Sequence, residues 1–147
     1  MRRTINLTAV ALVAATAFLC AGLRSNGEEA DSRSRIKLNQ AALEHVRGLI
    51  DRGMVVNDKK GSWRGHRPSA ADENEFVRRH DFGEYGKWYL GIDESRGENA
   101  KARYKFPIGD FRNVHRCALL AAQSRARQYG YKGIEAAATQ LLQRIER

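Results

Sequence analysis

Two residues in the last third of the chain, His115 and Cys117, are of the types that bind metal ions or carry out thiol chemistry. They fall in a stretch expected to be helical, from about Phe111 to Tyr129. On a helix, side chains two residues apart project about 200° from one another, so these two are not expected to bind the same ion. Cys117 lies on the apolar face of this helix, and we interpret it as a small buried hydrophobic residue.

The other residues that could carry chemistry are dispersed along the chain. His45, His66 and His80 show no spacing typical of metal ligands, and two cysteines cannot build a disulfide framework or a four-cysteine zinc site. Asp93 and Glu94 could act as acid and base, although acids in a polar loop are usually only solvated. The sequence contains no nucleotide-binding glycine loop, nucleophile elbow or zinc-protease helix. We therefore expect a non-enzymatic protein with no cofactor and no metal.

The charge distribution indicates a binding function instead. The formal net charge is +9 at pH 7, and residues 101–147 carry ten Lys and Arg against three Asp and Glu. This excess favours an anionic partner, with nucleic acid as the first choice and acidic lipid or acidic protein as alternatives. Tyr104 and Phe106 alternate with some of the basic side chains, as in many nucleic-acid-binding surfaces. The candidate binding face consists of Lys101, Arg103, Lys105, Arg112, Arg116 and Arg127. The alternative is a solvated basic surface without a partner.

Two helices are expected to position this face. Asp110 can cap the first, Phe111–Tyr129, and Gly130 can supply the left-handed residue that ends it. The second, about Ile134 to Ile145, has a single apolar stripe, and the tight turn between them resembles helix-turn-helix geometry. Arg125 falls on the apolar face of the first helix. Its stem either covers the core with the charged end in water, or its guanidinium is buried against a carboxylate or an aromatic ring.

The rest of the domain is expected to be mainly α. The expected elements are a helix with Asn39 as its N-cap, a short strand at Met54–Val56, a helix from Pro68 and Ser69 to about His80, a short helix in the aromatic run Phe82–Leu90, and a strand at Tyr104–Ile108. The predicted fold is a compact single domain of four or five helices with one or two short strands or extended arms, preceded by an N-terminal hydrophobic segment.

The N-terminal region differs in composition from the rest. Residues 1–23 combine a basic start with an uncharged run from Thr4 to Leu23, typical of a signal peptide or membrane anchor. Residues 24–37 are polar and aperiodic and predict a flexible linker, so the folded domain is expected at residues 38–147. A genuine N-terminal segment implies a membrane-anchored or exported protein, and otherwise a cytoplasmic one. The alternative function is therefore a membrane-tethered or exported protein-interaction domain.

Three segments of the domain carry a resemblance to a known kind of protein: FGEYGKWYLGID, RYKFPIGDFRNVHRC and AQSRARQYG. Together they resemble a small, functionally unassigned bacterial domain that occurs as a free-standing soluble protein. They are more loosely similar to C-terminal segments encoded near phage head-maturation proteases. The resemblance covers about Leu38 to Arg147 and implies no activity. The first 37 residues depart from that pattern.

Overall fold

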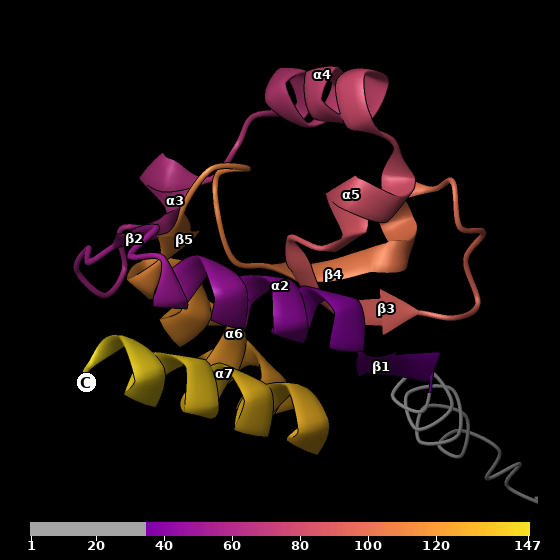
Figure 1. The fold of residues 1–147 in the computed structure, drawn as a ribbon. Coiled ribbons are helices and arrows are strands. Elements are labelled where there is room, and N and C mark those ends of the chain that lie inside the picture. The colour runs from indigo at the N-terminus through magenta and orange to yellow at the C-terminus, as the bar shows by residue number, and fades with distance from the viewer. Residues whose placement is uncertain (1–34) are drawn as a thin grey trace, which may run out of the picture.

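The computed structural model describes residues 35–147 and shows a mixed α/β domain (Figure 1). The predictions for residues 1–23 and for most of the linker lie outside the described residues. None of the helices in the described part is both long and apolar enough to cross a membrane. In chain order the elements are β1 (Ile36–Leu38), α2 (Gln40–Asp51), β2 (Val55–Val56), α3 (Trp63–His66), α4 (Ala70–His80), α5 (Phe82–Gly86), β3 (Tyr89–Asp93), the 3-10 turn η1 (Lys101–Arg103), β4 (Tyr104–Pro107), β5 (Val114–His115), α6 (Arg116–Tyr129) and α7 (Lys132–Ile145).

The described residues form six helices and two small sheets, where the sequence predicted a mainly α fold of four or five helices with one or two short strands or extended arms. Strand β3 lies in the middle of an antiparallel sheet between β1 and β4, while β2 and β5 form a parallel pair. The aromatic run is therefore helical only as far as Gly86, and the predicted helix to Leu90 is wrong. Within β3, Gly91 leaves room for the neighbouring strand, since a Cβ there would lie 2.8 Å from Phe106. The chain joins the sheet at Ile36, two residues before the expected start of the domain.

Several helix boundaries agree with the capping signals in the sequence. The side chain of Asn39 accepts a hydrogen bond from the backbone N–H of Ala42, and its amide donates to the carbonyl oxygens of Gly86 and Tyr89. This buried asparagine thus fixes the start of α2 against the sheet. A capping box between Ser69 and Asp72 begins α4. Gly130 ends α6 with a φ of 77°, the left-handed conformation that was predicted.

The core lies between the helices α2, α6 and α7 and the face of β3. Figure 1 shows α2 and α7 side by side, with α4 and α5 on the other side of the molecule. The largest fully buried side chains of the core are Tyr85, Leu90, Ile108, Leu119, Ile134, Leu141, Val46, Val114 and Cys117. Burial of this apolar surface is the main stabilising term of the fold.

Helix α6 begins at Arg116, five residues later than predicted. Asp110 does not cap it: its carboxylate accepts from the backbone N–H groups of Arg112 and Asn113 within a tight turn. Phe111 has a φ of 67° and stacks on Phe76, with ring centroids 4.3 Å apart. The next residues form β5, because their backbone groups pair with β2 and with the segment before the turn.

Candidate functional site

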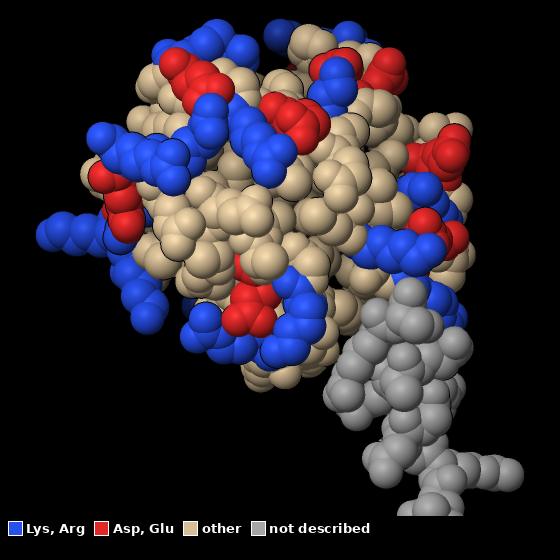
Figure 2. All heavy atoms as spheres, turned by 60° about the horizontal axis from the view of Figure 1, so that its bottom comes forward, with Lys and Arg blue, Asp and Glu red and all other residues tan. Residues whose placement is uncertain are grey.

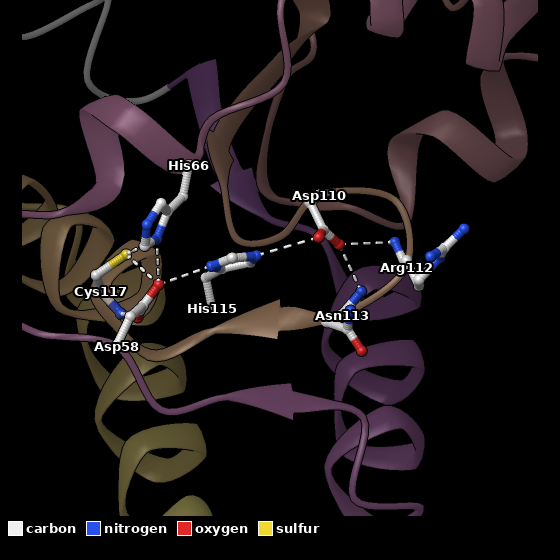
Figure 3. Close-up of polar contacts among 7 residues, drawn as sticks. All are labelled: Asp58, His66, Asp110, Arg112, Asn113, His115 and Cys117. Atoms are coloured by element: carbon white, nitrogen blue, oxygen red, sulfur yellow. Dashed lines mark hydrogen bonds and ion pairs between the residues drawn. The ribbon is translucent and has the colours of Figure 1, made fainter.

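Three side chains that were not expected to meet converge on the carboxylate of Asp58 (Figure 3). Asp58, in the connection between β2 and α3, directs Oδ2 to Nδ1 of His66 at 2.6 Å and to Nδ1 of His115 at 2.7 Å. The thiol of Cys117 donates to the same oxygen at 3.0 Å, and the backbone N–H of Cys117 donates to Oδ1 at 2.6 Å. We call Asp58, His66, His115 and Cys117 the polar cluster.

The polar cluster corrects the prediction that His115 and Cys117 point away from each other. That prediction placed both residues inside a helix. In the structure His115 belongs to strand β5 and Cys117 to the first turn of α6, so the change of backbone conformation between them turns both side chains toward Asp58. Cys117 is buried, as expected, but its sulfur is a hydrogen-bond donor and not merely an apolar contact.

The electrostatics of the polar cluster favour a protonated thiol. Burial and the nearby Asp58 carboxylate raise the pKa of Cys117 to about 12. Burial alone raises the pKa of Asp58, but hydrogen bonds from Cys117, His115 and His66 outweigh it and hold that pKa well below its ordinary value. A thiol held in this way is a poor nucleophile, because the reactive form is the thiolate.

A second carboxylate approaches His115 from its other side. Oδ2 of Asp110 lies 3.3 Å from Nε2 of His115, although the geometry of this contact is not that of a hydrogen bond. Burial raises the pKa of Asp110, but hydrogen bonds from the turn backbone and the nearby imidazole lower it overall. Among the described residues, the ligand atoms of the polar cluster all lie within 4.8 Å of one another, so this set could hold a metal ion.

A large open groove lies beside the polar cluster. It has a volume of about 1070 Å³ and is bordered by α3, by η1 with β4, and by α6. Five cationic residues line it: Arg64, Arg67, Lys101, Lys105 and Arg125. Its aromatic lining consists of Trp63, Tyr85, Tyr89, Tyr104, Phe106, Tyr129 and Tyr131. We call this feature the basic groove.

One acid, Glu73, lies in the lining of the basic groove. Its carboxylate is 3.4 Å from Nζ of Lys101 and 3.7 Å from the guanidinium of Arg67. The hydroxyl of Tyr89 donates to the same carboxylate at 3.3 Å and lies 2.6 Å from the hydroxyl of Tyr85. The three remaining cations of the lining leave the groove with an excess of positive charge.

The paired tyrosines predict a pH-dependent stability. Burial raises the pKa of Tyr85 to about 12 and also raises that of Tyr89. Unfolded tyrosine ionises near pH 10, so the unfolded chain releases these protons first. The stability that the tyrosine pair contributes is therefore complete below about pH 10 and is lost as the pH rises toward 12.

Phenolate absorbance measured against pH should show that at least two of the five tyrosines do not ionise until the protein unfolds. Ionisation of all five near pH 10 in the folded protein would contradict this.

The structure separates the six basic residues predicted as one face. Lys101 and Lys105 line the basic groove. Arg103 donates to the carbonyl of Arg96 outside it, and Arg112 lies in the 110–113 turn instead of on a helix. On other surfaces, two of the predicted residues contact acids: Arg116 contacts Glu146 and Arg127 contacts Glu135. Figure 2, viewed toward α7, likewise shows Lys and Arg next to Asp and Glu around an uncharged area.

Three groove cations were not among the predicted residues: Arg64, Arg67 and Arg125. The segment WRGHR at residues 63–67 interleaves basic and aromatic side chains and was a usable signal. The sequence places Arg125 on the apolar face of the predicted helix, apart from the candidate binding face. In the structure it is exposed, with its guanidinium 5.7 Å from the ring centroid of Tyr129, so neither the core-covering nor the fully buried arrangement describes it.

Comparisons with protein-family models, curated proteins and solved structures found no match to this chain.

Proposed function

We propose that the domain is a non-enzymatic binding module whose basic groove holds a single-stranded segment of nucleic acid. The observation that carries this proposal is the lining of the groove, in which five cations and five at least partly exposed aromatic rings occur with one acid; the other two lining aromatics, Tyr85 and Tyr89, are buried. Single-stranded nucleic acids are bound by grooves in which cations contact phosphates and bases stack on aromatic rings. Tyr129, the one exposed large hydrophobic residue of the described part, stands at this groove and offers such a ring.

The shape of the binding region favours a single strand over a duplex. Reading a duplex requires a helix or ribbon that protrudes into a major groove about 12 Å wide. Helix α7, the second of the pair expected to resemble a helix-turn-helix, buries its apolar stripe on α6 and α2. Two of its basic residues contact acids: Lys132 contacts Glu135 and Arg144 contacts Asp51. The basic groove is recessed, which suits a flexible strand.

The proposal predicts that three groove cations set the affinity for single-stranded DNA. Arg64, Lys105 and Arg125 are changed together to Gln, because the groove's other two cations contact Glu73. Binding of a labelled oligonucleotide, measured by fluorescence anisotropy at several salt concentrations, should weaken at least about tenfold, or 1.4 kcal/mol. The slope of log affinity against log salt should shrink by up to about 2, since each phosphate contact contributes about 0.7 in single strands.

A matched variant removes the same number of charges elsewhere. Changing Arg112, Arg116 and Arg127 to Gln should leave oligonucleotide binding close to that of the wild type, since these residues lie outside the groove. Loss of binding in this variant alone would assign oligonucleotide binding to these three residues of the candidate binding face. Binding to vesicles of acidic lipid with none to oligonucleotides would overturn the proposal in favour of a membrane-associated role.

A further inference from the structure

We infer that the polar cluster is a metal centre for a divalent transition-metal ion, zinc foremost. Its ligand atoms are a carboxylate oxygen, two imidazole nitrogens and a thiol sulfur, the three donor types that bind zinc in proteins. The mixture of sulfur and nitrogen donors disfavours magnesium and calcium, which take oxygen ligands. The inference stands independently of the nucleic-acid proposal.

The ligand atoms lie within 4.8 Å of one another, so small side-chain movements would be needed to form a tetrahedral site. Zinc bonds of 2.0–2.3 Å place neighbouring ligand atoms about 3.3–3.6 Å apart. Sγ of Cys117 and Nδ1 of His66 are 3.9 Å apart. The oxygen of Asp58 lies nearer to its three partners, at hydrogen-bond distances of 2.6, 2.7 and 3.0 Å. A metal ion would replace the shared protons and move this oxygen outward by up to about 1 Å.

The surroundings of the ligands supply a second, independent observation. A histidine bound to a metal commonly has a carboxylate at its other ring nitrogen. Asp110 occupies that place, 3.3 Å from Nε2 of His115, and the turn backbone holds its carboxylate. This Nε2 is one of two buried polar side-chain atoms in the described residues that have no hydrogen bond. When Nδ1 binds a metal, Nε2 carries the proton and can donate it to Asp110.

An ion can reach the polar cluster from solvent. The His66 side chain is 40% exposed, whereas those of Asp58 and His115 are 7% exposed. His66 also comes from α3, a helix of four residues that carries Trp63 and Arg64 at the basic groove. A bound ion would tie α3 to β5 and α6, which carry His115 and Cys117.

The test is a titration of the full metal-free chain with Co²⁺ and then Zn²⁺. Cys20 is first changed to Ser, so that any thiolate signal comes from Cys117. We expect one Co²⁺ per chain, with the visible spectrum of a tetrahedral ion and a thiolate charge-transfer band, and stoichiometric displacement by Zn²⁺. Cys117→Ser should abolish the charge-transfer band. His66→Gln, a change at the most exposed ligand, should weaken binding while the far-ultraviolet circular dichroism stays that of the wild type.

Two further variants complete the design. Asp110→Asn should weaken metal binding about 10- to 100-fold, the usual effect of losing a partner of a ligating histidine. His80→Gln, at a histidine outside the polar cluster, should leave it unchanged. The inference is overturned if the folded chain binds neither ion at micromolar concentrations. It is also overturned if His66→Gln and Cys117→Ser bind as tightly as the starting protein.

Discussion

Replacing Asp58 with Ala is expected to lower the free energy of unfolding of the metal-free domain by about 2–4 kcal/mol. The carboxylate accepts from two imidazoles, a thiol and a backbone N–H, and its side chain is 7% exposed. Alanine would leave the ring of His115 and the backbone N–H of Cys117 buried without this acceptor. Urea denaturation monitored by circular dichroism, in the presence of a chelator, measures the change.

Asp51→Ala is the matched control for this prediction. Asp51 also contacts a basic partner, Arg144, but this pair lies at the surface. Exposed ion pairs contribute little to stability, so the control should unfold close to the wild type. Equal free energies of unfolding for the two aspartate variants would show that the polar cluster does not stabilise the fold.

The second large effect is expected at Gly109, in the connection between β4 and β5. A Cβ at this position would lie 2.4 Å from the carbonyl oxygen of Asn113 and 2.6 Å from the Trp88 ring. Both neighbours are fixed, one as backbone and the other as a buried side chain, so the strain cannot relax cheaply. Gly109→Ala should lower the free energy of unfolding by about 1–3 kcal/mol, the usual effect of overpacking.

Gly97→Ala provides the comparison for Gly109→Ala. A Cβ at Gly97 meets nothing within 4 Å. This alanine should leave stability unchanged or raise it slightly, because it reduces the freedom of the unfolded chain. Equal melting temperatures for the two alanine variants, measured by differential scanning calorimetry, would show that the turn at residues 109–113 adapts freely.

Local signals in the sequence predicted a large part of the fold. These signals depend only on residues close together in the sequence. The structure confirms the N-caps at Asn39 and Ser69, the helix end at Gly130 and the apolar stripe of α7. The predictions of secondary structure were wrong where strands distant in the sequence pair with each other, although the local spacing of apolar residues suggested a helix. The aromatic run enters the sheet after Gly86 because β3 pairs with β1 and β4, and α6 starts late because β5 pairs with β2.

The polar cluster was missed for the same reason. Asp58 is separated from His115 and Cys117 by 57 and 59 positions along the chain. Pairing of β2 with β5 is what brings these segments together. The contact between Asp58 and these residues thus depends on β5, a strand of only two residues. The helical periodicity of residues 111–129 led us to predict a helix at this position. Two cations of the basic groove, Lys101 and Lys105, belong to the face predicted from the sequence, whereas its other cations come from α3, the residue after it and α6.

The central claim, that the basic groove binds a single strand, is tested most directly by locating an oligonucleotide on the protein. The measurement is a heteronuclear NMR titration of the isotope-labelled chain with a short single-stranded DNA. We predict salt-reversible shifts at the backbone amides of Arg64, Lys105 and Arg125 and at the indole N–H of Trp63, all in the groove lining. Shifts confined to α7 and the 110–113 turn, or no shifts at low salt, would contradict the claim.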